Sequence, residues 1–217
     1  MPDYAARRRM MVDTQVRPSD VTKFPIIEAM LDVPREAFVP EALREAAYVG
    51  TNLEIAAGRV MLEPRTLSKM LDALVVGPRD LVLDIGCGFG YSTVILARLA
   101  EAVVGLEDSE DMAEEAAAIL DAQLVDNATI IAGPLAGGAP QHGPYDVIVV
   151  QGGIEELPAA IEEQLKEGGR IACVFMEGSL GVCRLGRKSG GQIAWRDIFN
   201  AAAPVLAGFE RKPEFTF

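Results

Sequence analysis

Short apolar runs and helical spacings of apolar residues alternate through the middle of the chain. Apolar runs typical of buried strands occur at 81–85, 102–106, 128–132, 146–150 and 170–176. Apolar residues at helical spacing lie between these runs, at 92–100, 111–124 and 158–166. Strands that alternate with helices favour parallel pairing through right-handed crossovers. The pattern therefore predicts an α/β fold with an open, doubly wound sheet, whose ligand crevice lies beyond the carboxyl ends of its first strands.

The chain before this core has a helical pattern. We expect short helices at 26–32 and 41–47, and a stronger one that begins at Pro64. The pair Gly77-Pro78 is a stop signal for this last helix. The chain is therefore expected to begin with a helical arm.

The chain after the core predicts antiparallel edge strands at 182–185, at 192–195 and at the end of the chain. A glycine pair at 168–169 is expected to close the helix before the last core strand. With 217 residues, the chain has the length of one domain. We divide it into a helical region at 1–76, a core at 77–176 and an edge region at 177–217.

The charge balance is strongly acidic, with 20 Lys and Arg against 32 Asp and Glu, a net charge of −12. This balance disfavours nonspecific binding to nucleic acid or to anionic membranes. The run Arg7-Arg8-Arg9 is a local exception, which we interpret as a solvated arm. No apolar run reaches the ~18 residues of a membrane-spanning helix, and no signal peptide is evident.

Three cysteines without regular spacing argue against a disulfide framework or a zinc site. His142, the single histidine, disfavours a zinc centre or a His-triad hydrolase. We expect no metal site and a soluble protein in the reducing cytoplasm.

The candidate chemistry begins in residues 84–90, Asp-Ile-Gly-Cys-Gly-Phe-Gly, between a predicted strand and a predicted helix. Glycines there let the chain turn tightly and let a ligand approach the backbone. Glu107 follows Gly86 by 21 residues, at the end of the second strand, where its carboxylate can accept hydrogen bonds from both hydroxyls of a ribose.

The spacing of the glycines and Asp84 indicate which cofactor carries that ribose. The third glycine comes one residue too early for a dinucleotide fingerprint. The carboxylate of Asp84 would repel a pyrophosphate, whereas it would attract the cationic amino group of S-adenosylmethionine. A tight turn without any ligand is the alternative.

With these residues, the chain resembles the class I S-adenosylmethionine-dependent methyltransferases, and among them the protein-L-isoaspartate O-methyltransferase family. The resemblance extends from about residue 10 to about residue 176. The segments that carry it are 33–40 (VPREAFVP), 47–48, Gly58 with Pro64, 82–91, Glu107, 144–149 and 164–170.

This resemblance implies a Rossmann-like methyltransferase fold, S-adenosylmethionine as cofactor, and isoaspartyl residues of damaged proteins as methyl acceptors. It implies that Glu107 holds the ribose and that the loop at 58–64 covers the methyl group. The other residues expected at the cofactor are Asp84, Gly86, Cys87, Gly88, Gly90, Asp108, Gly133, Pro134 and Leu135. Within this set, Cys87 is interpreted as an apolar filler, and Asp108 as either a cofactor contact or a helix cap.

The chain departs from the family at the acceptor loop. Leu62 and Val60 stand where the family has hydroxyl residues, so they cannot hold a carboxylate by hydrogen bonds. Arg59 or Arg65 would supply a charge-assisted grip instead, unless both are solvated loop cations. The catalytic residues are left unassigned, with Arg59, Leu62 and Arg65 as the candidates.

Three functions remain open from the sequence. The first is methylation of isoaspartyl carboxylates in proteins or peptides. The second is methylation of another acceptor by a divergent paralogue, and the third is cofactor binding without catalysis. The sequence leaves the oligomeric state open.

Overall fold

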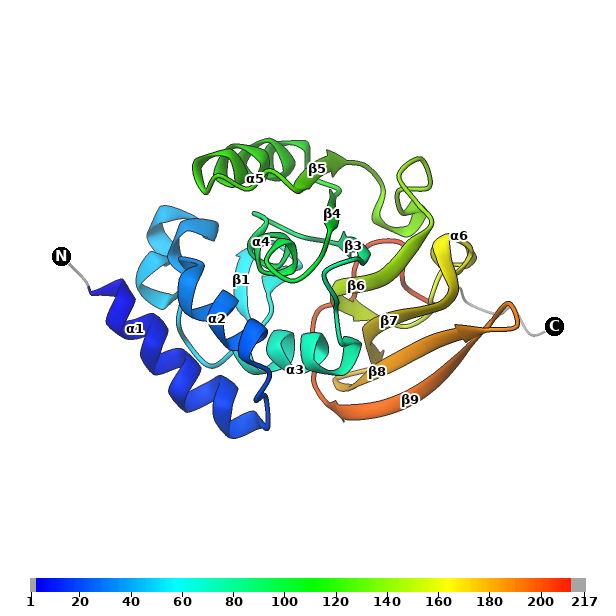
Figure 1. Cartoon of the computed structure of the whole chain (residues 1–217), viewed down its shortest axis with the longest axis horizontal. Coiled ribbons are helices and arrows are strands. Elements are labelled where there is room, and N and C mark those ends of the chain that lie inside the picture. Colours follow the sequence, from blue (N-terminus) through cyan, green and yellow to red (C-terminus); the bar gives the residue numbers. More distant parts are fainter. Residues whose placement is uncertain (1–2, 212–217) are drawn as a thin grey trace.

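The structure, a computed structural model, describes residues 3–211. A seven-stranded sheet forms its centre, in the order β5-β4-β3-β6-β7-β8-β9, and a separate two-stranded hairpin joins β1 to β2 (Figure 1). The strands are β1 (Leu53–Ala56), β2 (Arg59–Met61), β3 (Leu81–Ile85), β4 (Ala102–Glu107), β5 (Ala128–Ala132), β6 (Tyr145–Ile154), β7 (Leu165–Glu177), β8 (Leu180–Ser189) and β9 (Gln192–Asn200).

Helices precede the sheet and connect its parallel strands. The α-helices are α1 (Tyr4–Met11), α2 (Phe24–Asp32), α3 (Pro64–Leu74), α4 (Tyr91–Ala97), α5 (Glu110–Ala122) and α6 (Ala159–Gln164). A π-helical turn lies at Val12–Val16, and 3-10 turns lie at Arg17–Ser19, Arg35–Phe38, Glu41–Ala46 and Leu135–Gly137. None of the helices in the described residues is long and apolar enough to cross a membrane.

The five strands β3 to β7 pair in parallel, and β8 and β9 continue the sheet in antiparallel pairing. The chain leaves β3 toward β4 and β5 on one side, and returns through β6 to the other side of β3. The carboxyl end of β3 is therefore the point where the strand order reverses, which is where open α/β sheets bind ligands. The predicted doubly wound α/β fold with antiparallel edge strands is confirmed.

Both faces of the sheet are buried, so its central strands are apolar on both sides. On one face, Val82, Val147 and Val149 pack with α2, α3 and α4 in a large core. On the other face, Leu83, Ile148 and neighbouring residues pack against α6 and against Leu206 and Phe209 of the C-terminal segment. The alternation of faces along β3 explains why this strand is a continuous apolar run.

Most predicted elements are present, and two strands, β3 and β5, have the predicted bounds. The boundary between α6 and β7 was predicted wrongly: α6 ends at Gln164, and β7 begins at Leu165, before the glycine pair. Leu165 is buried and pairs with Tyr145, and the register then shifts before Arg170. Gly168, with φ of +79°, lies in this irregularity inside the strand.

The C-terminal edge strands are longer than predicted, at 180–189 and 192–200. Residues 201–211 form no further strand, apart from a single bridge between Val205 and Gly153. Part of the edge strand expected at the end of the chain, at 212–217, lies outside the described residues.

The run Arg7-Arg8-Arg9 is only in part a solvated arm, with Arg9 exposed. Arg8 donates hydrogen bonds to the carbonyls of Leu31 and Asp32 and to the hydroxyl of Tyr48. Met11 and Val12 beyond it are buried in the core. The prediction is therefore wrong for Arg8, because buried residues after the charged run anchor the helix against α2.

Gly153 is expected to be intolerant of a side chain, because a Cβ there would lie 2.5 Å from the carbonyl oxygen of Ala203. Backbone at this distance cannot give way cheaply, and overpacking of a core costs about 1–3 kcal/mol. We expect Gly153→Ala to lower the free energy of unfolding by this amount in urea titrations. Gly77→Ala is the control, since its nearest neighbour is 3.7 Å away. Equal stability of the two variants would contradict the packing described here.

Candidate functional site

The glycine loop follows β3 and leads into α4 at the carboxyl edge of the sheet. Gly86 has φ of +74° and Gly88 has φ of +57°, which glycine adopts without strain. The amide of Gly86 donates to the carbonyl of Leu106 on β4, at 2.8 Å. The loop is thereby held beside the end of β4, where Glu107 is the last residue.

Asp84 lies in β3, before the loop, and is fully buried. Its carboxylate accepts hydrogen bonds from Ser92 at 2.6 Å, Thr93 at 2.7 Å and Gln151 at 2.7 Å. Burial raises the pKa of Asp84 to about 6, although the three neutral donors oppose the rise. Both carboxylate oxygens therefore serve to join β3, α4 and β6. Its predicted role beside a cofactor amino group stays a prediction.

Glu107 is also fully buried, and its carboxylate is bound by the guanidinium of Arg59. Nη1 donates to Oε1 at 2.5 Å and Nη2 to Oε2 at 2.6 Å, which is a bidentate pair. The amides of Gly88 and Asp108 donate to the two oxygens as well, at 2.7 and 3.0 Å. The carboxylate expected to hold a ribose is thus bonded to protein groups on both oxygens.

Arg59 comes from β2, on the hairpin that lies over the glycine loop, and it also pairs with Asp108. Burial would lower the pKa of Arg59, but its bonds to Glu107 and the charges of both carboxylates raise it. Burial raises the pKa of Glu107, and the guanidinium opposes that rise. Arg59 is therefore the cation that makes a buried carboxylate tolerable at this position.

Little space remains between the hairpin and the glycine loop. The cavity there measures about 20 Å³, whereas pockets for cofactor-sized ligands measure ~300–1,000 Å³. Its lining includes Ile55, Val60 and Leu62 from the hairpin side and Gly86 and Gln151 from the sheet side. The donor and acceptor groups suit a ribose-bearing cofactor, but the space between them does not admit one in this conformation.

An open groove of about 560 Å³ adjoins this closed cavity on the side of β5. Gly133, Pro134 and Leu135, which were expected near an adenine, line it together with Asp108 and Gly208. A second groove of about 670 Å³ runs past Arg59 and Asp108 on the other side of the hairpin tip. Gly133 and Pro134 are therefore at least partly exposed, whereas Leu135 is buried, and Asp108 contributes to both grooves.

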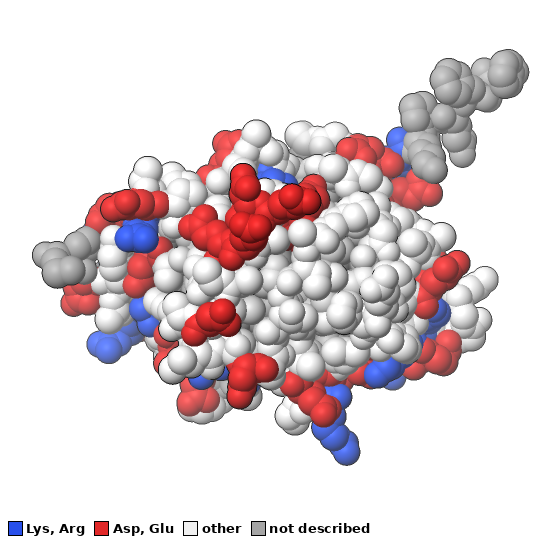
Figure 2. All heavy atoms as spheres, turned by 90° about the horizontal axis from the view of Figure 1, so that it is seen from above, with Lys and Arg blue, Asp and Glu red and all other residues white. Residues whose placement is uncertain are grey.

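The face that carries α5 is rich in acidic side chains and has few basic ones (Figure 2). Five exposed acidic residues of α5 contribute to it: Glu110, Asp111, Glu114, Glu115 and Asp121. Clustered charge of one sign attracts ligands of the opposite sign. Glu110 and Asp111 line the two grooves, which therefore favour a cationic ligand.

The remaining predicted residues have partners of their own. Asp108 is not the helix cap, because Ser109 accepts from the amide of Met112 at the start of α5. Cys87 is buried, and burial raises the pKa of its thiol, which suits an apolar filler. Arg65 contacts the ring of Phe199 on β9, at 5.3 Å, away from Glu107.

Arg35 is a residue that the sequence analysis missed as part of this site. It is fully buried, and burial lowers its pKa. Its guanidinium donates to the carbonyls of Ala47 and Leu62, both at 2.7 Å, and lies 4.7 Å from the centre of the Tyr91 ring. Arg35 thereby fixes the backbone at the end of the hairpin. The available signal in the sequence was a charged residue, Arg35, within the largely apolar segment VPREAFVP.

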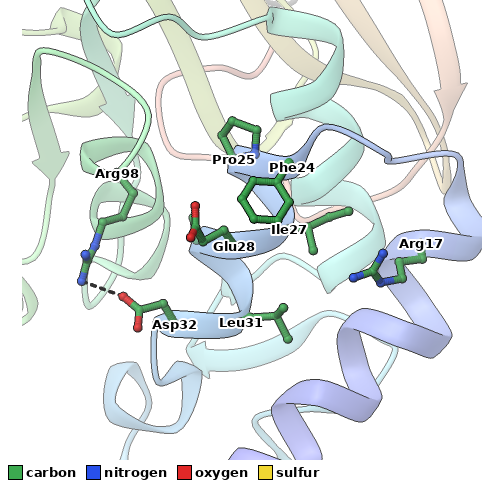
Figure 3. Close-up of a pocket in the computed structure, with 9 residues that line it drawn as sticks. Arg17, Phe24, Pro25, Ile27, Glu28, Leu31, Asp32 and Arg98 are labelled. Carbon is green, nitrogen blue, oxygen red and sulfur yellow. Dashed lines mark ion pairs between the residues drawn. The ribbon is translucent and has the colours of Figure 1, made fainter.

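A larger hollow, of about 690 Å³, lies on the outer side of α2 (Figure 3). Phe24, Ile27 and Leu31 line it, and Asp32 and Arg98 form an ion pair at its edge, at 2.9 Å. The residues predicted at the cofactor do not contribute to it, so its size does not make it the candidate site.

The comparisons with known proteins agree with one another. The family model of protein-L-isoaspartate(D-aspartate) O-methyltransferase matches residues 7–200. The protein-L-isoaspartate O-methyltransferase of Methylorubrum extorquens (strain PA1) is 34% identical over 210 residues, 96% of this chain and 92% of that protein. The one from Syntrophus aciditrophicus (strain SB) is 39% identical over 171 residues, 79% of this chain and 78% of that protein.

A solved structure of a beta-aspartate methyltransferase from Plasmodium falciparum, in complex with S-adenosyl-L-homocysteine, has the same fold. Its TM-score is 0.78 at 21% identity, and the match covers 95% of this chain and 99% of that one.

The buried carboxyl of Asp84 predicts a pH-dependent stability. Its folded pKa of about 6 lies above the ~3.9 of an unfolded Asp, so the folded state binds more protons between these values. The stability that Asp84 contributes is fully present below about pH 4 and is lost as pH rises through 6. At ~1.4 kcal/mol per pKa unit, Asp84→Asn should gain about 3 kcal/mol relative to the wild type between pH 4 and 7.

Urea titrations at four pH values across this window measure the difference. Asp146→Asn is the control and should change little with pH across this window, because the amide of Leu81 and the ammonium of Lys166 outweigh burial and lower the pKa of Asp146, which places its titration below about pH 4. A difference for Asp84→Asn that stays constant with pH would contradict the raised pKa.

Proposed function

The chain belongs to the protein-L-isoaspartate(D-aspartate) O-methyltransferase family, and we propose that it methylates isoaspartyl carboxylates of proteins and peptides with S-adenosylmethionine. The family that the sequence motifs predicted is confirmed. Members of this family are S-adenosylmethionine-dependent O-methyltransferases.

One observation carries the cofactor assignment: the Glu107 carboxylate lies at the end of β4, beside a glycine loop at the reversal of the strand order. A carboxylate there accepts the two hydroxyls of a ribose, and the loop backbone lets the cofactor approach. The open groove lined by Gly133 and Pro134 lies beside it, where the adenine is expected. When bound, S-adenosylmethionine would supply the methyl group.

The protein contributes to this reaction mainly by positioning the acceptor carboxylate. An acceptor carboxylate is already ionised at neutral pH, so the chain need not provide a general base. Its residues must instead hold the carboxylate in line and keep water away. Leu62 is buried and lines the cavity beside Gly86, and Arg35 fixes the carbonyl of Leu62. We assign the exclusion of water to Leu62, and the positioning of its backbone to Arg35.

The grip on the acceptor carboxylate cannot come from the side chains of Val60 and Leu62, which carry no hydrogen-bond donor. Arg65, at the start of α3, is partly exposed, and its contacts are long: 3.7 Å to Glu63 and 3.4 Å to the carbonyl of Asn200. Arg65 is therefore freer than Arg59 to bind a substrate carboxylate. We retain Arg65 as the candidate acceptor-binding residue.

Methyl transfer from labelled S-adenosylmethionine to an isoaspartyl peptide, with the matching aspartyl peptide as control, tests the proposed reaction. We expect base-labile label on the isoaspartyl peptide alone. A chain that binds S-adenosylhomocysteine and labels neither peptide would contradict the assigned acceptor and leave the family's cofactor chemistry in place.

Glu107→Gln tests the assigned ribose site. Hydrogen bonds to a charged group contribute ~1.5–3 kcal/mol, so the variant should bind S-adenosylhomocysteine about tenfold to 100-fold more weakly than the wild type. Isothermal titration calorimetry measures this, with circular dichroism to verify folding. Glu101→Gln is the matched control, since Glu101 is exposed directly before the same strand. Unchanged binding by Glu107→Gln would exclude Glu107 as the ribose-binding residue.

A further inference from the structure

The carboxylate that the proposed function needs for the cofactor is bonded to the protein's own guanidinium. We propose that Arg59 competes with the cofactor ribose for Glu107, and that the β1-β2 hairpin leaves the glycine loop when the cofactor binds. Arg59 is then a determinant of cofactor affinity in this chain. This inference rests on the proposed function, because it supposes that S-adenosylmethionine binds at Glu107.

The hydrogen-bond capacity of Glu107 carries the first step. An ionised carboxylate offers about four lone-pair sites on its two oxygens. Arg59 donates to both oxygens, the amide of Gly88 donates to Oε2, and the amides of Asp108 and Ser109 donate to Oε1, the last at 3.3 Å. No acceptor site is left for a ribose hydroxyl. The amides belong to the frame of the site, so the guanidinium is the group that must leave.

The packing around the glycine loop carries the second step. A Cβ built on Gly86 would lie 3.2 Å from Nη2 of Arg59 and 3.2 Å from Leu206, and one built on Gly88 would lie 2.7 Å from Ile55. The chain's own side chains thus make the close approach to the loop backbone that a ligand would otherwise make. Arg59 and Ile55 both belong to the hairpin, so moving this one element frees Gly88 and removes the guanidinium from Gly86, where Leu206 stays in place.

The hairpin is well suited to move. Its strands have four and three residues, and they pair with each other and not with the central sheet. An isolated two-stranded hairpin is marginally stable, so its position depends on a few side-chain contacts. Ala57 and Gly58 at the tip are exposed, and a Cβ on Gly58 would meet nothing within 4 Å.

The base of the hairpin is anchored, which confines the movement to residues 53–61. The amide of Glu63 donates to Asn52, and Asn52 donates to the carbonyl of Ala202. Arg35 holds the carbonyl of Leu62. The segment between these anchors carries Arg59 and Ile55, so its movement opens the site at Glu107 while Leu62, beyond the segment, stays in place.

With a competitor of this kind, the cofactor binds only the molecules in which Arg59 has left Glu107. The apparent affinity is therefore the intrinsic affinity multiplied by the fraction of molecules in that open state. Removing the guanidinium therefore strengthens cofactor binding. We expect Arg59→Gln to bind S-adenosylhomocysteine about tenfold or more tightly than the wild type in isothermal titration calorimetry. Arg79→Gln is the control and should bind as the wild type does, because Arg79 is exposed and precedes β3, at the opposite end of that strand from the glycine loop.

The outcomes separate this inference from the proposed function. Equal or weaker binding by Arg59→Gln, with binding by the wild type, overturns the competition and leaves the function intact. Absence of binding by both proteins overturns the function and the inference together.

Hydrogen exchange of the wild type tests the movement without any substitution. On saturation with S-adenosylhomocysteine, amides at 86–90 should exchange more slowly, whereas amides at 53–61 should exchange faster. A hairpin that becomes protected together with the glycine loop would contradict the displacement.

Discussion

The buried carboxylate of Glu107 is the constraint on which the site depends. A charge without water must be paired and hydrogen-bonded, or it destabilises the fold. In this structure, Arg59 supplies the counter-charge, and the amides of Gly88, Asp108 and Ser109 donate further hydrogen bonds. Whatever enters the site must satisfy the same oxygens. The affinity of the site for any ligand is therefore measured against the guanidinium that already occupies it.

Two buried carboxylates stand on neighbouring parallel strands and have different partners. Asp84 on β3 is bound by neutral donors from α4 and β6, all of them within the sheet and its covering helix. Glu107 on β4 is bound in part by a hairpin that does not pair with the sheet. The first carboxylate fixes the frame around the glycine loop. The second has a partner that is able to leave, which is what a binding site requires.

Elements encoded by local patterns could be predicted from the sequence. The apolar runs of β3 and β5 defined both strands, and the spacing between the glycine loop and Glu107 identified the carboxylate at the strand reversal. The pairing of Arg59 with Glu107 could not be predicted, because it joins residues 48 positions apart through the folding of the hairpin.

Other misses also reflect tertiary packing. The early start of β7 depends on the burial of Leu165 beside Tyr145, and this burial overrode the glycine stop signal. Leu206 reaches the glycine loop from a C-terminal segment without regular structure, so no periodicity marked it. In each case, the local pattern competed with a contact that only the complete fold creates.

A crystal structure of the chain with S-adenosylhomocysteine tests the central claim most directly, because it shows which group occupies Glu107. The account predicts the two ribose hydroxyls on the Glu107 oxygens, and the Arg59 guanidinium withdrawn with the hairpin. S-adenosylhomocysteine bound elsewhere, with the pair between Arg59 and Glu107 intact, would contradict it.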